Sequence, residues 1–578
     1  MSELEGILGI KFPKGIKISH ATNDSKKVKK NSIFFGLQGT QAHGSKYINE
    51  ALKLGASIVV HDDPKYKADK NANIFYLEDL EKIDFYEFLN QLYFYENNEP
   101  KRDYGMDIVT ISGITGTNGK TTTAMLCHQI VQTEKGSDSI YIGTLGASYN
   151  NGEFFTSFSR NTTPNIFEFF EIITFFENKH KFFNHGDGKD IHIFLEVSSH
   201  ALDQNRLKNV PFANAAILNI EHDHIDYHKD LESYVDAKFK IRQQNITRVF
   251  YRESDRPTVF VNIDSPEVYK KIETIINNEQ QLKPKWDYHD ECFYTVSNNE
   301  LKRADFKYEI LNSNSKETEV KFSLGDHSVI KFKTNLFLDF NITNLIFAIL
   351  LTRHSLILFH REDLSTTNGF DEVLLPDKTR EQIKGDQFQV VKYDAYWNFY
   401  LKGIAFELDF ENHQDNFALN LKMPKGRSEL LDKLENNIPV NIIIDYAHNP
   451  DAFETFLSAT KDYFENLITV FGCGGNRDKL KRPDMLKKAI KYSSQVVFTS
   501  DNSRDEEFKE ILKDASEGNN LDNVIAIEDR KEAIIHASKL LKDKDCLVIL
   551  GKGHEETQEI NGKITHFSDY EVVHEIYK

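Results

Sequence analysis

Short apolar runs of strand-forming residues alternate with amphipathic stretches of helix length in the middle of the chain. Strand-like runs occupy 107–113, 191–199 and 212–220, whereas 121–132 and 231–241 have the periodicity of helices. Parallel strands need a crossover connection, which is usually a helix. The pattern therefore predicts an α/β domain built on a parallel sheet.

A second series of the same kind lies near the C-terminus. Apolar runs at 440–447, 467–475, 495–502 and 546–553 are each followed by a charged segment with helical character. We predict a separate Rossmann-like α/β domain, in which ligand-binding groups lie at the carboxyl ends of the strands.

The domain organisation follows from these two series and from the chain length. At roughly 100 to 200 residues per domain, 578 residues suggest three or four domains. The polar stretch 95–105 holds the first boundary. A polar, poorly periodic segment near 355–420 is interpreted as an inserted subdomain of unknown role, with a partner-binding surface as the alternative, because it holds the aromatic cluster 392–400. The predicted domains are 1–105, 106–355, 356–420 and 421–578.

Composition and charge exclude several classes of protein. Lys and Arg sum to 71 against 89 Asp and Glu, and the net charge of −18 repels phosphate backbones, so we expect no nucleic-acid partner. No run of about 18 apolar residues occurs, so we expect no membrane insertion. The four cysteines form no Cys-x-x-Cys pair, which favours a reducing, cytoplasmic location. The histidines of 176–190 fit no metal-ligand spacing, and we interpret that segment as a solvated loop.

The sharpest motif is glycine-rich and stands between a predicted strand and a predicted helix. It runs from Gly113 through Gly116 and Gly119 to Lys120 and Thr121. Backbone N–H groups and a helix N-terminus there would surround a polyphosphate, with the lysine on the β- and γ-phosphates and the threonine hydroxyl on Mg²⁺. The glycine spacing departs from G-x-x-x-x-G-K-[ST], but the strand and helix on either side still predict a phosphate loop.

Glu196 is a further candidate for a metal site, and two other polar residues, His224 and Lys238, are open to a plainer interpretation from the pattern alone. Glu196 ends an apolar strand, where a buried carboxylate is costly unless a cation or hydrogen bonds compensate it, and Mg²⁺ on ATP phosphates is a natural partner. His224 follows another strand, and a capping or core histidine is the alternative interpretation. Lys238 lies on a predicted helix, where the pattern alone indicates a solvated surface residue.

Taken together, the motifs resemble those of the Mur ligase superfamily. Within it, the chain is most similar to the ligases that add the third residue of the peptidoglycan stem peptide. The segments that carry the resemblance are 116–122, 161–164, 196–206, 219–228, 426–427, 445–451, 472–478, 501–504 and 551–555.

The resemblance implies a three-domain Mur ligase architecture with a central ATPase domain, and it implies ATP and Mg²⁺ as cofactors. It makes Lys120, Glu196, His224 and Lys238 the catalytic residues, with Lys238 carbamylated by CO₂ into an anion that coordinates metal. The implied metal ligands are Thr121, Glu196, His224 and carbamylated Lys238. The implied ATP-binding residues are Gly116, Thr117, Asn118, Gly119, Lys120, Thr121, Thr122, Asn344, Arg427, Asp445 and His448.

The resemblance also assigns two substrate sites. Ser25, Thr162, Thr163, Ser198, Gln204 and Arg206 match the site for the UDP-linked peptide, although an N-terminal domain without a ligand is the alternative for Ser25. Arg477, Asn502, Arg504, Gly551 and Glu555 match the amino-acid site. Arg504 favours a substrate with a second carboxylate, which a guanidinium holds bidentately, and Glu555 balances the distal ammonium. Ser503 and Asn476 depart from the family motifs, which have Pro and Asp there.

The implied activity is ATP-dependent addition of meso-2,6-diaminopimelate to UDP-N-acetylmuramoyl-L-alanyl-D-glutamate through an acyl phosphate, by a cytoplasmic monomer. Three alternatives stay open at this point. They are addition of L-lysine, a ligase of the folate polyglutamate or cyanophycin type, and a nucleotide-binding protein that has lost catalysis.

Overall fold

The computed structural model describes most of the chain. The described residues are 1–39, 42–66, 73–96, 99–100, 109–132, 137–156, 161–184, 190–243, 258–282, 293–299, 301–302, 304–324, 328–366, 420–433 and 439–578. They form two compact units. The first unit contains Met1–Ile220, His224–Lys307 and Phe347–Ile404, and the second contains Glu221–Asp223, Tyr308–Ile346 and Ala405–Lys578.

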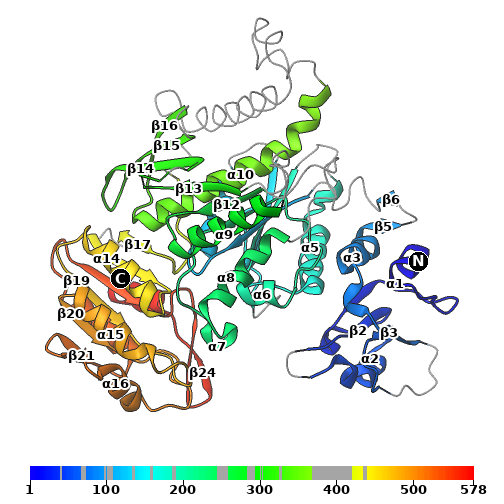
Figure 1. The fold of residues 1–578 in the computed structure, drawn as a ribbon. Coiled ribbons are helices and arrows are strands. Elements are labelled where there is room, and N and C mark those ends of the chain that lie inside the picture. Colours follow the sequence, from blue (N-terminus) through cyan, green and yellow to red (C-terminus); the bar gives the residue numbers. More distant parts are fainter. Residues whose placement is uncertain are drawn as a thin grey trace, which may run out of the picture. The chain divides into compact units, whose positions relative to one another are not determined.

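The N-terminal part of the first unit is a small parallel sheet with helices (Figure 1). Its strands, in spatial order, are β1 (His20–Thr22), β2 (Ser32–Gly36), β3 (Ala56–His61) and β4 (Ile74–Tyr76). Its helices are α1 (Ser2–Leu8), α2 (Ile48–Leu54) and α3 (Phe85–Phe94). A short hairpin of β5 (Tyr95–Glu96) and β6 (Glu99–Pro100) follows within the predicted boundary stretch.

The rest of the first unit is built on the predicted central sheet. The strands run in the order β13 (Phe293–Ser297), β12 (Thr258–Asn262), β11 (Asn214–Ile217), β7 (Val109–Thr115), β10 (Asp190–Glu196), β8 (Ser137–Gly143) and β9 (Gly146–Tyr149). The helices are α4 (Lys120–Val131), α5 (Ile166–His180), α6 (Ser199–Asp203), α7 (Ile225–His228), α8 (Leu231–Phe239) and α9 (Pro266–Leu282).

The register of the central strands positions the candidate site. β10 pairs in parallel with both β7 and β8, and Ile193 lies opposite Ile111 and Ile140 in one buried core. The same register sets Glu196 beside Ile114, so the carboxyl ends of β7 and β10 are adjacent. The loop that follows β7 therefore starts next to the Glu196 side chain.

The second unit contains the predicted C-terminal sheet. Its strands run in the order β17 (Glu429–Lys433), β18 (Pro439–Asp445), β22 (Cys546–Leu550), β19 (Leu467–Phe471), β20 (Gln495–Phe498) and β21 (Val524–Ala526). Its helices are α14 (Pro450–Lys461), α15 (Lys481–Tyr492), α16 (Phe508–Ser516), α17 (Arg530–Ser538) and α18 (Asp569–Ile576). Three further strands, β14 (Phe306–Ser313), β15 (Thr318–Leu324) and β16 (Ser328–Thr334), continue the order of the central sheet beyond β13. The remaining helix and strands are α10 (Asp339–Thr366), which has residues in both units, and the pair β23 (Thr557–Ile560) and β24 (Lys563–His566).

Both faces of this sheet are covered, which explains why its strands are continuously apolar. Ile443 packs into a core with α14, α15 and α16, and these helices lie side by side in Figure 1. Its neighbour Ile442 packs into a second core with α17 and α18. Successive side chains of a strand point to opposite faces, so both must be apolar. The α/β prediction, with a Rossmann-like C-terminal domain, is confirmed.

Two predictions about segments need a correction or a comment. The segment 176–190 was predicted to be a solvated loop, but Phe176–His180 is the last turn of α5 and so is helix. Phe182 and Phe183 are buried. Residues 185–189 lie outside the described residues. Burial of the aromatic side chains keeps this segment packed against the protein, although polar residues lie between them. Of the predicted insert 356–420, the structure describes residues 356–366, where α10 ends, and residue 420.

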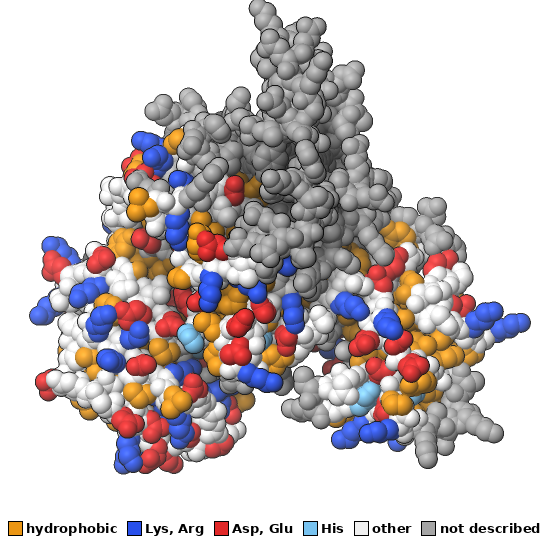
Figure 2. All heavy atoms as spheres, viewed as in Figure 1, with side chains coloured by type: hydrophobic (Ala, Val, Ile, Leu, Met, Phe, Trp, Pro, Cys, Tyr) orange, Lys and Arg blue, Asp and Glu red, His pale blue; other side chains and the backbone are white. Residues whose placement is uncertain are grey.

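The described surface carries both signs of charge. On the face shown in Figure 2, Lys and Arg side chains are interspersed with Asp and Glu over the described residues. Within the described residues, no helix combines the length and the hydropathy needed to cross a membrane.

Candidate active site

The predicted phosphate loop joins β7 to α4. Gly119 caps the helix with φ of 86°, a left-handed conformation that glycine adopts without a steric cost. The Lys120 ammonium donates to the backbone carbonyls of Gly116 (2.8 Å) and Thr117 (2.9 Å), so it crosses back over the loop. These contacts hold the cation above the N-terminus of α4, where an anionic ligand is favoured.

A residue to which the sequence assigned no role, Asn219, anchors this loop. The Asn118 N–H donates to Asn219 Oδ1 at 2.8 Å, and the Thr117 N–H donates to the Asn219 carbonyl at 2.9 Å. Asn219 follows β11, the neighbour of β7 in the sheet. The conformation of the loop therefore depends on the adjacent strand as well as on its own glycines.

Glu196 is fully buried, at 0% exposure, and its carboxylate accepts four hydrogen bonds. The Thr121 hydroxyl donates to Oε2 at 2.9 Å, which joins the carboxylate directly to the phosphate loop. The Thr144 hydroxyl (3.0 Å), the Thr144 N–H (3.0 Å) and the Tyr141 hydroxyl complete the set. These donors compensate the burial of the charge and fix its orientation.

Sequence reasoning missed Tyr141 and Thr144, and also the glycine between them. A Cβ atom at Gly143 would lie 2.1 Å from Glu196 Oε1, so the carboxylate fits only beside a glycine. The three residues come from β8 and the turn after it, while Glu196 ends β10. No motif of contiguous residues contains both partners, and β8 was not among the strands that the sequence predicted.

His224 and Lys238 come together around Tyr234. His224 is exposed and makes no capping hydrogen bond with its side chain, so neither alternative interpretation of it is correct. Its ring centroid lies 6.2 Å from that of Tyr234, and the Lys238 ammonium lies 4.6 Å from the same ring. The Tyr234 hydroxyl is 3.1 Å from the Thr117 hydroxyl, so this cluster reaches the phosphate loop.

Lys238 is buried, with only 1% exposure, which contradicts the interpretation as a solvated surface residue. A lysine side chain is rarely buried without a compensating partner. The four implied metal ligands offer a hydroxyl, a carboxylate, an imidazole and a modifiable amine, and oxygen-rich sets suit Mg²⁺. Among the described residues, no group of three or more His, Cys, Asp or Glu is arranged to hold a metal ion.

The residues predicted to bind the UDP-linked substrate surround the same strand end. The Thr163 hydroxyl donates to the Glu196 carbonyl and accepts from the Ser198 N–H, both at 2.9 Å. Arg206 donates to the Thr163 carbonyl at 3.3 Å and to Gln204 Oε1 at 2.9 Å. Thr162 joins the group through the Thr144 hydroxyl, at 3.3 Å. Tyr227, which the sequence did not single out, accepts from Gln204 at 3.1 Å.

Ser25 lies in the N-terminal part of the first unit, between β1 and β2. Its hydroxyl donates to Glu50 at 2.9 Å, at the start of a single helical turn, Ser25–Lys27. Lys27 pairs with Glu171 of α5 at 2.9 Å. Because α5 begins just after Thr163, the Ser25 segment is tied to the helix that follows the substrate residues.

The remaining predicted nucleotide residues belong to the second unit. The Arg427 guanidinium stacks 4.3 Å from the ring centroid of Tyr446, and His448 Nδ1 lies 2.8 Å from the Tyr446 carbonyl. Asp445 accepts from the N–H groups of Ser428 (2.6 Å) and Ala447 (2.7 Å). Burial raises the pKa of the Asp445 carboxyl, and the Arg427 charge and these N–H donors oppose the rise. Asn344 is buried on α10.

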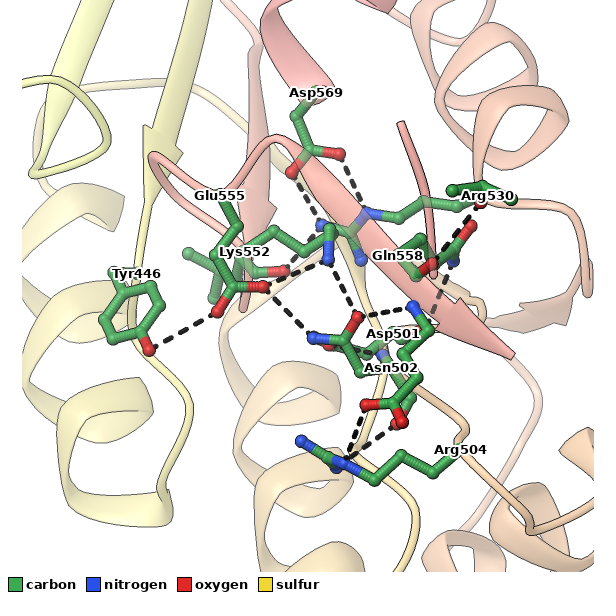
Figure 3. Close-up of polar contacts among 12 residues, drawn as sticks. Tyr446, Asp501, Asn502, Arg504, Arg530, Lys552, Glu555, Gln558 and Asp569 are labelled. Atoms are coloured by element: carbon green, nitrogen blue, oxygen red, sulfur yellow. Dashed lines mark hydrogen bonds and ion pairs between the residues drawn. The ribbon is translucent and has the colours of Figure 1, made fainter. Parts of the chain in front are cut away.

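The predicted amino-acid residues gather at the carboxyl ends of β19, β20 and β22. Figure 3 shows Glu555, Asn502 and Arg504 in one connected set of contacts. Asn502 Nδ2 donates to Glu555 Oε2 at 3.1 Å, and Arg504 Nη1 donates to the Gly475 carbonyl at 2.7 Å. A Cβ at Gly551 would lie 2.7 Å from Asp501, so this strand end also requires glycine. Arg477 is exposed on the same loop as Gly475.

A fully buried lysine, Lys552, contacts two of these residues, and the sequence had given it no role. Its ammonium lies 3.1 Å from Glu555 and 3.3 Å from Asn502 Oδ1 (Figure 3). The buried ion pair of Arg530 with Asp569, at 2.8 Å, is joined to the end of β22, because Arg530 Nη2 donates to the Leu550 carbonyl at 3.0 Å. The Tyr446 hydroxyl also reaches Glu555, at 3.5 Å.

The site has a phosphate loop beside a buried carboxylate, and a cluster of polar residues lies in a separate Rossmann-like domain. Comparison with protein families agrees with this arrangement. The family models for the Mur ligase middle domain, the glutamate ligase domain and the Mur ligase catalytic domain match residues 114–352, 426–553 and 17–88. The chain belongs to the Mur ligase family.

Relatives in that family extend over nearly the whole chain. A UDP-N-acetylmuramoyl-L-alanyl-D-glutamate–2,6-diaminopimelate ligase of Aquifex aeolicus is 31% identical over 97% of this chain and 94% of its own length. The ligase of the same name from Clostridium perfringens is 30% identical over 97% of this chain and 95% of its own. A solved structure of a ligase of that name has a TM-score of 0.59 at 24% identity, covering 99% of this chain and 98% of its own, and so supports the fold.

Proposed function

We propose that this protein is an ATP-dependent amide-bond ligase that adds meso-2,6-diaminopimelate to UDP-N-acetylmuramoyl-L-alanyl-D-glutamate in peptidoglycan precursor synthesis. Membership of the Mur ligase family and the activity for which its near full-length relatives are named support this proposal. The structural observation that carries it is the bond from Thr121 of the phosphate loop to buried Glu196, whose backbone carbonyl contacts Thr163. Nucleotide and acceptor residues thus converge on one strand end.

A carboxylate does not condense with an amine at neutral pH without activation. In the proposed reaction, the D-glutamate γ-carboxylate attacks the γ-phosphorus of ATP, and the bond to the β-phosphate oxygen breaks to release ADP. Lys120 and the loop N–H groups stabilise charge on the transferred phosphoryl oxygens. Thr121, Glu196, His224 and carbamylated Lys238 would hold Mg²⁺, which neutralises phosphate charge when it is bound.

The amine of diaminopimelate then attacks the carbonyl carbon of the acyl phosphate. The tetrahedral intermediate expels phosphate and loses a proton, which leaves the amide. Arg477, Asn502 and Arg504 are proposed to orient the amino acid. Gly551 and Glu555 are proposed to receive its ammonium end, because Glu555 presents a carboxylate there.

The carbamate on Lys238 is part of the proposal. CO₂ adds to the neutral amine, which loses a proton and becomes a carboxylate-like anion. The burial of Lys238 close to Tyr234 and the phosphate loop supports this modification.

Other parts of the proposal concern organisation. We propose the four domains 1–105, 106–355, 356–420 and 421–578, acting as a monomer in the cytoplasm. The described cysteines Cys127, Cys473 and Cys546 are all buried and free, which suits a reducing compartment.

A phosphate-release assay with the UDP-dipeptide and a panel of amino acids tests the substrate. We expect kcat/KM for diaminopimelate to exceed that for L-lysine by tenfold to over a hundredfold, because lysine leaves Arg504 without its carboxylate partner. In Arg504→Ala the ratio of kcat/KM for diaminopimelate to that for L-lysine should fall to near one. Equal use of both amino acids, or preference for lysine, would show that the amino-acid assignment is wrong even if the ligase assignment holds.

A further inference from the structure

Arg504, the residue proposed to bind the distal carboxylate, lies against strand β23. Its N–H donates to the Glu559 carbonyl at 3.0 Å, and its own carbonyl accepts from the Asn561 N–H. The Glu559 N–H in turn donates to Asn502 Oδ1 at 3.0 Å. These backbone bonds fix β23 alongside the pocket, so the Glu559 side chain starts from a defined position next to Arg504.

The Arg504 guanidinium already has contacts on two of its nitrogens. Nη1 donates to the carbonyls of Gly475 (2.7 Å) and Asn502 (3.4 Å), which use both of its hydrogens. A carboxylate can therefore bind in a bidentate manner only at the other edge, formed by Nε and Nη2. Glu559 Oε2 lies 3.4 Å from Nε, at that edge.

Glu559 differs in this respect from the other acidic side chains nearby. Glu555 contacts Lys552 and Asn502 instead. Glu556, three residues before Glu559, pairs with Lys425 at 2.7 Å. Successive side chains of a strand point to opposite sides. Gln558, which precedes Glu559 on β23, therefore points away from Arg504, and it donates to the Asp501 carbonyl.

We propose that Glu559 is a specificity-determining residue, which acts as an internal counter-ion of Arg504 and competes with the second carboxylate of the amino-acid substrate. The inference rests on the proposed ligase function. When diaminopimelate binds, its distal carboxylate shares the Nε edge of Arg504 with the Glu559 carboxylate. Repulsion between the two carboxylates lowers the affinity of the enzyme for diaminopimelate. When lysine binds, Glu559 keeps Arg504 neutralised and reduces the repulsion of the ε-ammonium. Glu559 thus lowers the ratio of kcat/KM for diaminopimelate to that for L-lysine.

The test is the ratio of kcat/KM for diaminopimelate and L-lysine in the wild type and in Glu559→Gln, which keeps the size of the side chain and removes its charge. We expect the ratio to rise about two- to fivefold, the scale of a partly exposed ion pair, and mainly through a lower KM for diaminopimelate. Glu556→Gln is the matched control, because it removes the same charge from the same segment without touching Arg504. That control should leave the ratio unchanged.

The same substitution in an Arg504→Ala background shows whether Glu559 acts through Arg504. There Glu559→Gln should have no further effect on the ratio, because the partner is absent. An unchanged ratio in Glu559→Gln, an equal shift in Glu556→Gln, or a shift that persists in Arg504→Ala would overturn the inference while the ligase function stands. A wild type inactive with every amino acid would overturn the proposed function and this inference together.

Discussion

Lys120 is bound to two carbonyls of its own loop and so lies at the N-terminus of α4 without taking part in a core. We predict that Lys120→Ala lowers kcat by roughly 100- to 1,000-fold, as for the loss of one preorganised charge-stabilising group. The thermal unfolding midpoint should stay close to that of the wild type. A folded variant that keeps more than about a tenth of kcat, a loss below about 1.4 kcal/mol, would contradict the phosphate-loop assignment.

Lys238 allows a second prediction at the scale of one residue. Because its buried side chain is proposed to carry the carbamate, Lys238→Ala should be severely impaired, and short carboxylic acids should partly restore activity by supplying the missing anion. Activity of the wild type should fall when dissolved CO₂ is removed. The intact mass of the active enzyme provides a readout besides activity, since a carbamate adds the mass of CO₂.

The matched control is Lys240→Ala, since Lys240 lies just after α8 and pairs with Asp203 at the surface, at 2.7 Å. It should keep normal activity and show no response to carboxylic acids. Normal activity in Lys238→Ala, or an unmodified lysine in a fully active enzyme, would show that the carbamate proposal is wrong.

At the scale of elements, α4 is joined to the strand pair β8 and β9 through a neutral histidine. His128 is completely buried, and its Nε2 accepts the Asn151 N–H at 3.0 Å, so that nitrogen must be unprotonated. Its Nδ1 lies 2.7 Å from the Ser139 hydroxyl. Burial lowers the pKa of His128 to about 3, from an ordinary value of 6.5.

This histidine predicts a loss of stability in acid. Between pH 6.5 and 3 the unfolded chain binds a proton at His128 that the folded chain does not, so the free energy of unfolding falls as the pH falls. At pH 5 the loss from this group is on the order of 2 kcal/mol. Denaturant unfolding of the wild type and of His128→Gln between pH 7 and about 5 tests this prediction. The free energy of unfolding should fall less steeply with falling pH in the variant. An equal fall in both proteins would contradict the prediction.

At the scale of the whole molecule, the proposed reaction has two halves that use different substrates. The phosphate loop and the Thr163 network serve the first half, and the pocket of Asn502, Arg504 and Glu555 serves the second. We therefore predict that an acyl phosphate forms with ATP and the UDP-dipeptide alone. Added hydroxylamine should trap it as a hydroxamate, detected by mass spectrometry.

Two variants separate the halves. Lys120→Ala should form no hydroxamate, whereas Arg504→Ala should still form it, because its defect lies in binding the amino acid. Absence of any hydroxamate in a preparation that forms the amide would contradict the acyl phosphate route.

The sequence by itself determined the features that depend on local order and on periodicity. The glycine-rich loop is a contiguous motif between a strand and a helix, so its position in the chain follows from neighbouring residues, although its conformation also depends on Asn219 after β11. Apolar runs of strand length predicted two parallel sheets, and the position of Glu196 at the end of one run predicted that a carboxylate would lie near that loop. The structure agrees on these points.

Only the tertiary structure decided which distant side chains meet. Tyr141 and Thr144 hold Glu196 because β8 pairs with β10, and Glu559 approaches Arg504 because β23 lies against the segment after β20. Lys238 has the local pattern of a surface lysine, yet packing of α8 buries it beside Tyr234. Local sequence sets which way a side chain points from its own helix or strand, whereas burial and electrostatic partners depend on contacts between segments far apart in the chain, which local periodicity does not encode.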